Sequence, residues 1–471
     1  MRRTSQAVTA VALVAGLLAP AGLADAAVTF TPGAPGSGDP YFPDMGNGGY
    51  DVGHYDINLA YDPKTKAIAA TTVVKARATQ NLSRFDLDFM GPLKISKLTV
   101  DGKKAAYKRT GAQELVITPP RGLVKGAHFT VSVTYAGVPK MINDPALGIS
   151  GWVATKDGAV ALDQPFGAAT FYPVNDSPRD KATYNFTITV PNGLYALANG
   201  EPDPMRITAN GGHVFGWHMN QPMASELSMI AIGKYNIVHG KALNGIPNIT
   251  ALGTSLDKSQ GKAFNTFTAD TLKWETSIYG AYPFRSTGGI IDSAHVNYAL
   301  ETQSRPFYDQ STSVLDKSTI AHELGHQWFG DSLTPAHWSD IWLNEGFATY
   351  TEWLWSEKTG GQTAQQIFDK TYAGEQAADG WQGIVSDPGR DHIFGTLVYN
   401  RAAMFLHTLR KTVGDGIFFP LVKKWATDHR YGNVSTTEFA AFATNFAGNF
   451  GHQDLTGLFK SWIYSPGKPT L

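Results

Sequence analysis

Apolar and polar residues alternate along most of the first half of the chain. The alternation is clearest at residues 84–89 and 129–135, where every second side chain is apolar. A period of two places the apolar side chains on one face of a strand. An Asp-Gly pair at 101–102 adds a hairpin signal. We therefore predict an antiparallel, β-sandwich-like domain over residues 50–240.

The pattern changes after residues 239–247, where Gly, Asn and Pro interrupt the alternation. Helical spacing of apolar residues dominates from there on, and the Ser-Thr-Thr-Glu string at 435–438 is a capping-box sequence. An extended stretch at 288–298 predicts an edge strand beside a cleft. Further helices are predicted at residues 317–329, 343–355 and 396–411. The protein is therefore expected to be α+β, with a mainly helical second domain and a small mixed sheet over 241–471.

The first residues have a different character. A basic Met-Arg-Arg start, an Ala-, Val- and Leu-rich run over 7–23 and small residues at 24–26 form a secretory signal pattern. We predict that residues 1–26 are a signal peptide and that the mature protein is secreted into the extracellular space. A membrane anchor is the alternative, although the run is short for a span. Residues 27–49, rich in Gly and Pro, are predicted to be a flexible lead-in.

Charge and cysteine content narrow the possible chemistry. The formal net charge is -1, the pI is about 6.9, and no long run of like charge occurs. Nucleic acids and membrane surfaces are bound by clustered positive charge, so we expect neither as a partner once the signal peptide is removed. The chain has no cysteine. Any metal must therefore be held by histidines and carboxylates.

The string His-Glu-Leu-Gly-His at residues 322–326 is the strongest chemical signal. On a helix, His322 and His326 project from one face and can bind one metal ion. A zinc hydrolase uses three protein ligands and leaves one position for water. We predict Glu345 as the third ligand, because eighteen residues separate it from His326 and its carboxylate lies in an apolar stretch at 342–348. One zinc ion per chain is expected, although such a site accepts neighbouring transition metals.

The predicted chemistry follows from the position of Glu323 beside the first ligand. Zinc lowers the pKa of a bound water to about 7. Glu323 can take the proton as this water attacks a carbonyl carbon, and pass it to the leaving amine. The oxyanion that develops needs another donor, a Tyr or a His, which spacing alone does not identify. A chance occurrence of the motif on a solvated helix is the alternative, but apolar neighbours predict a buried helix.

Two longer strings closely resemble the aminopeptidase-N-like gluzincin family of zinc metallopeptidases, which includes the leukotriene hydrolase branch. They are His-Glu-Leu-Gly-His-Gln-Trp-Phe-Gly-Asp at 322–331 and Trp-Leu-Asn-Glu-Gly-Phe-Ala at 342–348. The resemblance implies a β domain followed by a thermolysin-like catalytic domain with zinc aminopeptidase activity. Larger members carry an extensive helical domain after the catalytic one. We expect this chain to be a short, bacterial-type member without that domain, and its cleft to be more open.

The resemblance also suggests roles for three further residues. Tyr-Ala-Leu-Glu-Thr at 298–302 resembles the family's Gly-Ala-Met-Glu-Asn motif, so Glu301 is expected to bind the free amine of the substrate, although three of the five letters differ. Gln164 resembles a second amine contact in the β domain, and Tyr399 resembles the catalytic tyrosine that donates to the oxyanion. Asp331 and Asp340 are candidates for orienting the ligand imidazoles. Ordinary surface, hydrogen-bonding and core roles are the alternatives for Glu301, Gln164 and Tyr399.

We therefore expect a secreted, monomeric zinc aminopeptidase that acts on peptides. Two alternatives remain open. One is a zinc endopeptidase or a broader hydrolase of the same fold, which the altered motif at 298–302 and the short C-terminal part favour. The other is a catalytically silent binding protein that keeps the fold. Three further histidines have no ligand spacing and are expected to be structural or exposed: His337, His392 and His407.

Overall fold

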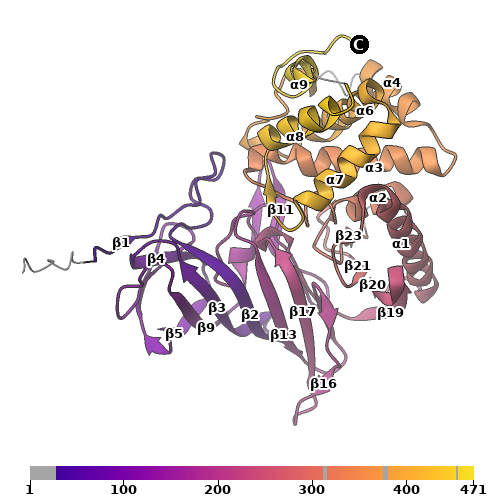
Figure 1. Cartoon of the computed structure of the whole chain (residues 1–471). Helices are drawn as coiled ribbons and strands as arrows, with labels where there is room; N and C mark the ends of the chain where they lie inside the picture. Colours follow the sequence, from indigo (N-terminus) through magenta and orange to yellow (C-terminus); the bar gives the residue numbers. More distant parts are fainter. Residues whose placement is uncertain (1–27, 311–315, 375–379, 452–453) are drawn as a thin grey trace, which may run out of the picture.

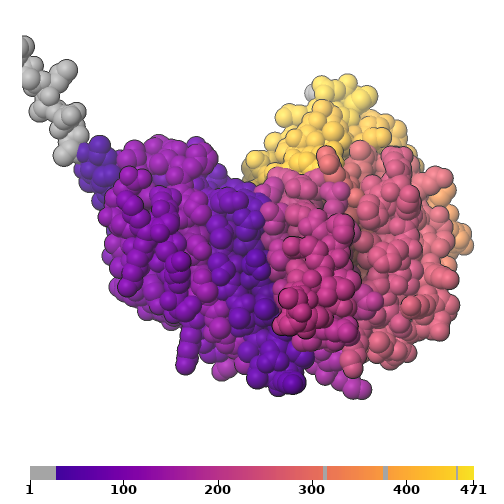
Figure 2. All heavy atoms as spheres, turned by 90° about the horizontal axis from the view of Figure 1, so that it is seen from below, coloured from indigo at the N-terminus to yellow at the C-terminus, as the bar shows by residue number. Residues whose placement is uncertain are grey.

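The computed structural model describes residues 28–310, 316–374, 380–451 and 454–471. The signal peptide expected at residues 1–26 lies outside them. Figure 1 shows a sheet-rich N-terminal half beside a helical C-terminal half, and the two halves also lie side by side in the space-filling view of Figure 2. The α+β fold with a β domain followed by a mainly helical catalytic domain is confirmed. No helix in the described part of the chain combines the length and apolarity needed to cross a bilayer.

Three sheets build the β domain, and period-two burial is evident in their long strands. In β3 and β9, nearly every second residue is buried. Most neighbouring strands are antiparallel, as predicted, but β2 pairs with β13 and β1 pairs with β4 in parallel. The Asp-Gly turn at 101–102 connects β5 to β6, and both of its residues have positive φ.

The strands of the β domain belong to a nine-stranded, a four-stranded and a five-stranded sheet. The nine-stranded sheet contains β15 (Glu201–Pro202), β17 (His213–Met223), β13 (Ala182–Val190), β2 (Tyr50–Asp62), β3 (Ala67–Ala78), β9 (His128–Gly137), β5 (Lys94–Val100), β6 (Lys103–Lys104) and, beside β17, β16 (Arg206–Ile207). The four-stranded sheet contains β1 (Thr31–Pro32), β4 (Leu82–Asp88), β8 (Glu114–Thr118) and β7 (Ala106–Thr110). The five-stranded sheet contains β10 (Met141–Asp144), β11 (Gly148–Ala154), β12 (Ala159–Leu162), β18 (Ile230–Gly233) and β14 (Tyr195–Ala198).

A second five-stranded sheet, mixed in direction, lies in the catalytic domain. Its order is β19 (Tyr235–Ala242), β20 (Ile246–Gly253), β21 (Thr287–Asp292), β23 (Phe307–Asp309) and β22 (Ala299–Leu300). The chain enters this sheet with β19, a few residues before the boundary expected at 240. The prediction of an edge strand at 288–298 is wrong. The strand in this region, β21, is buried along its whole length and pairs on both sides, because β23 lies between it and the edge strand β22.

The helices of the catalytic domain agree with the predicted regions but not with all predicted ends. The capping box at 435–438 is confirmed at the start of α8. The helix expected over 317–329 ends at Gly325, and the chain continues in turns to Gly330, whose φ is +135. The helices are α1 (Lys258–Tyr279), α2 (Lys317–Gly325), α3 (Trp342–Lys358), α4 (Ala364–Ala373), a π-helical segment (Leu397–Arg401), α6 (Ala402–Val413), α7 (Asp415–Asp428), α8 (Thr436–Gly448) and α9 (Thr456–Trp462). A short pair of strands, β24 (Thr334–Pro335) and β25 (Asn433–Val434), joins the turn after α2 to the loop before α8.

Residues 28–49, where a flexible lead-in is expected, lie against both domains, and we call them the strap. Phe42 is 4% exposed, and its ring is 5.1 Å from that of Phe166 in the β domain and 6.0 Å from that of Trp338 in the catalytic domain. Asp39 accepts a 2.8 Å hydrogen bond from the backbone N–H of Trp338. These contacts differ from the expectation, because composition rich in Gly and Pro does not show where a single buried aromatic ring is anchored.

Candidate active site

Helix α2 presents the two histidines of the motif from one face. Asp316 caps the helix by accepting a 2.9 Å hydrogen bond from the backbone N–H of Ser318. His322 lies in its last turn, and His326 is the residue that ends it. The centroids of the two imidazole rings are 4.7 Å apart. Both rings are buried, so the helix carries two nitrogen ligands into the protein interior.

Glu345 reaches the same point from the first turn of α3. Its Oε2 atom is 3.4 Å from the Nε2 atom of His322 and 3.4 Å from that of His326. Ligand atoms bound to zinc at about 2.0–2.1 Å in a tetrahedral arrangement are about 3.3–3.4 Å from one another. The donor set of two imidazoles and one carboxylate, its spacing and its burial therefore fit a zinc ion.

Each imidazole is oriented by a hydrogen bond from its Nδ1 atom. Nδ1 of His322 donates to the carboxylate of Glu352 at 2.6 Å, and Nδ1 of His326 donates to the carbonyl of Phe329 at 3.0 Å. Both Nε2 atoms are thereby directed at Glu345. Such partners fix the tautomer and the direction of a metal-binding imidazole.

Asp331 and Asp340, the expected orienting residues, do not perform this role. Asp340 accepts hydrogen bonds from the backbone and side chain of Thr436. Both carboxylate oxygens of Asp331 are buried and meet no hydrogen-bond partner in the described part of the chain. The expectation was wrong because it relied on nearness in sequence. Glu352, two helical turns after Glu345, could have been found from its position on the same face of α3.

The charges of the site are strongly coupled. Burial alone would raise the pKa of Glu345, but the imidazoles of His326 and His322 hold it down at about 2. Burial alone would lower the pKa of His322, but its hydrogen bonds to Glu345 and Glu352 outweigh burial and raise it. A metal binds neutral imidazole, so the extra proton that the raised pKa keeps on His322 must leave when the metal binds.

Glu323 lies beside the first ligand, and its carboxylate faces the same cavity. Its Oε2 atom is buried and has no hydrogen-bond partner among the residues described. Burial raises the pKa of Glu323 to about 8, although the two imidazoles act in the opposite direction. A general base must keep the proton that it takes from water until it passes the proton on. A carboxyl group with a pKa near neutral pH can do this.

Tyr399 comes from the π-helical segment before α6. Its ring stacks on that of His322 with a centroid distance of 6.1 Å and an interplanar angle of 18°. Short π-helical stretches inside helices are frequent at functional sites. The segment therefore places a phenol beside the imidazole of the first metal ligand.

Glu301 and Gln164, from different domains, meet in the cavity that the metal ligands line. The side-chain amide of Gln164 donates a 2.7 Å hydrogen bond to Oε1 of Glu301, and both residues are buried. Gln327, just after the zinc motif, supports this loop: it donates to the Glu301 carbonyl at 3.3 Å and accepts from the backbone N–H of Ser304 at 2.7 Å. Glu301 is thus held by both domains, through its carboxylate by Gln164 and through its backbone carbonyl by Gln327.

All the candidate residues line one cavity of about 320 Å³. A larger groove of about 1070 Å³ lies over the nine-stranded sheet, but no histidine lines it. Thr319, Ala299 and Glu352 were not predicted from the sequence. The residues that line the smaller cavity are Gln164, Ala299, Glu301, Thr319, His322, Glu323, His326, Glu345, Glu352 and Tyr399.

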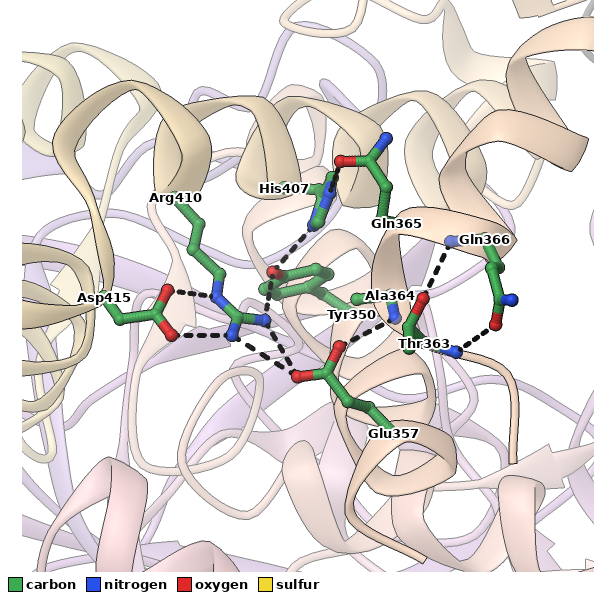
Figure 3. Close-up of polar contacts among 9 residues, drawn as sticks. All are labelled: Tyr350, Glu357, Thr363, Ala364, Gln365, Gln366, His407, Arg410 and Asp415. Carbon is green, nitrogen blue, oxygen red and sulfur yellow. Dashed lines mark hydrogen bonds and ion pairs between the residues drawn. The ribbon is translucent and has the colours of Figure 1, made fainter. Parts of the chain in front are cut away.

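A polar network anchors the far end of α3, the helix that carries Glu345 (Figure 3). His407 of α6 bonds to the hydroxyl of Tyr350 at 3.2 Å and to the side chain of Gln365 at 3.1 Å. Arg410 of α6 contacts Glu357 at 3.3 Å and Asp415 at 2.7 Å. His407 is therefore structural, as expected, and the network fixes α3 against the helix that follows Tyr399.

Comparison with known proteins agrees with this geometry. Residues 52–227 match the peptidase M1 N-terminal domain, and residues 297–462 match the peptidase family M1 domain. The chain is 25% identical to "Probable aminopeptidase 1" of Sulfurisphaera tokodaii over 424 residues, which are 84% of this chain and 51% of that protein. It is 25% identical to "Aminopeptidase N" of Lactobacillus delbrueckii subsp. lactis over 457 residues, which are 89% and 51%. The chain thus spans about half the length of the curated relatives it matches.

Solved structures cover nearly the whole chain. The M1 zinc metallopeptidase from Deinococcus radiodurans superimposes with a TM-score of 0.83 and 27% sequence identity, over 93% of this chain and 98% of that one. A mutant of that enzyme bound to a Tyr-Ser-Ala substrate gives a TM-score of 0.81 and 28% identity over 93% and 99%. With both domains matched and the ligand cluster in place, the chain belongs to peptidase family M1, and its cofactor is zinc.

Proposed function

We propose that this protein is a zinc aminopeptidase that hydrolyses the N-terminal peptide bond of peptides. The observation that carries the proposal is the position of Glu301. Ligand atoms of Glu301, Glu323 and His326 lie within 4.8 Å of one another, so an anchor for a cation stands directly beside the reacting centre. A carboxylate so close to the scissile bond pairs with the α-ammonium of the first residue. An internal peptide bond offers no charge at this distance.

Each residue around the metal has a separate role in the proposed reaction. Zinc, when bound by His322, His326 and Glu345, lowers the pKa of water and polarises a carbonyl. Glu323 accepts the proton from the attacking water and delivers it to the leaving amine. The hydroxyl of Tyr399 donates to the oxygen on which negative charge develops.

Two further residues of the same cavity position the substrate. Glu301 pairs with the substrate's ammonium, while Gln164 holds Glu301 in place and offers its own amide oxygen. Similar proteins support this reading. Both curated relatives named above are called aminopeptidases, and the Deinococcus radiodurans mutant was crystallised with a tripeptide.

The test compares aminoacyl amides with their N-acetylated counterparts. We expect the free amines to be cleaved and the acetylated amides to be cleaved at least about 100-fold more slowly, because acetylation removes the charge that Glu301 recognises. Equal cleavage of both would instead indicate a zinc endopeptidase or a broader hydrolase. Turnover of neither, with zinc bound, would indicate a silent binding protein.

A variant separates the base from the metal site. Glu323→Gln removes the proton acceptor but leaves the three ligands intact, so turnover is expected to fall by a factor of about 10²–10⁴ or more. Zinc content, measured by atomic emission, should stay near one per chain. Full turnover in this variant would refute the role of Glu323.

We also propose that the mature protein is exported. The support is the basic start, the apolar run and the small residues that end at position 26. Expression of the whole chain in a host with a general secretion pathway, followed by N-terminal sequencing, tests the proposal. Enzyme in the medium that begins at Ala27 is expected, and cell-bound enzyme that begins at Met1 would contradict it.

A further inference from the structure

A lysine of the β domain reaches the turn that follows the zinc motif. Lys181, directly before β13, uses its ammonium group to contact three backbone carbonyls of the catalytic domain. Nζ donates to the carbonyls of Asp331 at 3.0 Å, Ser332 at 2.9 Å and Gly432 at 3.3 Å. An ammonium group has three N–H donors, so these contacts use its whole donor capacity.

The turn that Lys181 contacts is built on the second zinc ligand. The backbone N–H of Asp331 donates to the carbonyl of His326 at 3.0 Å. The imidazole of His326 in turn donates to the carbonyl of Phe329 at 3.0 Å. Gly330 leaves little space, since a Cβ atom there would be 3.0 Å from Nδ1 of that imidazole. The direction of the His326 ring therefore depends on the path of residues 329–332.

Neighbouring contacts join the same two segments. The carbonyl of Pro178, three residues before Lys181, accepts from the side chain of Asn433 at 2.7 Å and from that of Thr334 at 3.2 Å. Lys181 contributes three hydrogen bonds to this group. Burial lowers the pKa of its amine to about 7, while the nearby carboxyl groups of Asp331 and Glu226 act in the opposite direction. Lys181 therefore makes three hydrogen bonds across this contact, where the Pro178 carbonyl makes two.

We propose that Lys181 is a positioning residue through which the β domain holds the turn that orients His326, so that zinc affinity depends on a side chain of the other domain. The rival explanation is that Lys181 only adds stability to the domain interface. The two differ in one respect. General stability does not alter the affinity or the ligand field of a metal in a protein that remains folded.

The test uses Lys181→Met, which keeps most of the apolar part of the side chain and removes its donors. The matched control is Lys75→Met on the same domain, which breaks an ion pair with Asp56 on the surface. Zinc affinity is measured by competition with a chromogenic chelator, and the geometry of the site by the visible absorption of the Co²⁺-substituted protein. Loss of support for a metal ligand weakens metal binding by a factor of about 10–100.

For Lys181→Met we expect zinc affinity to fall about 10-fold and the Co²⁺ spectrum to change, with the fold preserved by circular dichroism. Lys75→Met should match the wild type in both measurements. A folded Lys181→Met with unchanged affinity and spectrum would overturn the proposal.

A second variant, Lys181→Gln, keeps two donors and is measured if Lys181→Met does not fold. Intermediate affinity in it supports the proposal, and wild-type affinity overturns it. Failure of both to fold, while Lys75→Met folds, also overturns it, because Lys181 would then serve general stability. These measurements need no peptide substrate, so their failure is distinguishable from a failure of the proposed function.

Discussion

At the scale of single residues, the direction of two imidazole rings determines whether a metal site exists. The partners of their Nδ1 atoms are different in kind: a side chain, Glu352, for His322, and a backbone carbonyl, that of Phe329, for His326. Of these two partners, only the side chain of Glu352 can be removed by substitution, because every residue at position 329 would keep a backbone carbonyl. Glu352 also accepts from the hydroxyl of Ser318 at 2.9 Å, so the carboxylate is itself held in place.

Substitution of Glu352 tests this orientation. Glu352→Ala is expected to weaken zinc binding by a factor of about 10–100, and Glu352→Gln by less, because its amide oxygen still accepts from Nδ1 of His322. Competition with a chelator measures the effect. Asp340→Asn serves as the control, since Asp340 contacts Thr436 and not a ligand, and its zinc affinity should stay within about twofold of the wild type. An equal loss in both variants would count against Glu352 as the orienting residue.

At the scale of elements, the position of α3 against α6 determines how Glu345 faces Tyr399. Glu345 lies in the first turn of α3, and Tyr399 lies in the π-helical segment that leads into α6. In the network of Figure 3, Arg410 of α6 joins α3 through Glu357 and α7 through Asp415. The side chain of Arg410 is only 12% exposed, so its contacts are partly shielded from solvent.

Removal of this charge is expected to weaken the helical domain. Arg410→Met should lower the free energy of unfolding by about 1–3 kcal/mol, because it leaves Glu357 without its cation in a partly buried position. Urea titration followed by tryptophan fluorescence measures the change. The control is Lys424→Met, which breaks an exposed pair with Asp428 four residues away and should cost about 0.3–0.5 kcal/mol. Similar losses in both variants would mean that the network adds no more than a surface pair.

At the scale of the whole molecule, residues far apart in sequence hold the two domains together. The strap places Phe42 between rings of both domains, and Arg390 of the catalytic domain lies over the same ring while it pairs with Asp144 of the β domain. Phe166, which contacts Phe42, is two residues after Gln164. The strap thus supports the domain interface next to the wall of the cavity.

Truncation of this ring tests the strap. Phe42→Ala is expected to lower the free energy of unfolding by about 3 kcal/mol or more, the usual cost of replacing a buried phenylalanine by alanine. Val28→Ala, at a side chain that is 57% exposed, is the control and should change stability by less than about 0.5 kcal/mol. Urea titration again provides the measurement. A loss no larger than that of the control would show that the strap does not stabilise the molecule.

Buried carboxylates give the whole molecule a pH-dependent stability. Burial raises the pKa of Asp176 from 3.8 to about 7, although Ser225 and the backbone of Ala169 donate hydrogen bonds to it. Between these two pH values the folded state holds a proton that the unfolded state has released. Stability from this group is therefore complete below about pH 4 and is lost as the pH rises to about 7.

Asp176→Asn removes this titration. The substitution itself changes the free energy of unfolding by an amount that does not depend on pH. Beyond that amount, the variant is expected to gain up to about 4 kcal/mol relative to the wild type as the pH rises from 4 to 8. Unfolding free energies from urea titrations at several pH values in this range measure the difference. Parallel profiles for the two proteins would show that Asp176 titrates normally.

The sequence by itself determined the local features of this protein. Period-two burial, the Asp-Gly turn at 101–102, the capping box at 435–438 and the four-residue spacing of the histidines depend on residues a few positions apart, and the structure confirms each of them. Glu345 could also be predicted, since a buried carboxylate at that distance needs a cation. Zinc was the expected metal for this donor set of two imidazoles and one carboxylate.

Only the tertiary structure decided the contacts that depend on how elements pack. Examples are the hydrogen bond between His322 and Glu352 and the one between Gln164 and Glu301, which are 137 positions apart in sequence. Others are the contact of Lys181 with the carbonyl of Asp331 and the position of β21 inside its sheet. Such pairs depend on how whole elements pack, which is the sum of many weak contacts. A short stretch of sequence does not contain enough information to predict that sum.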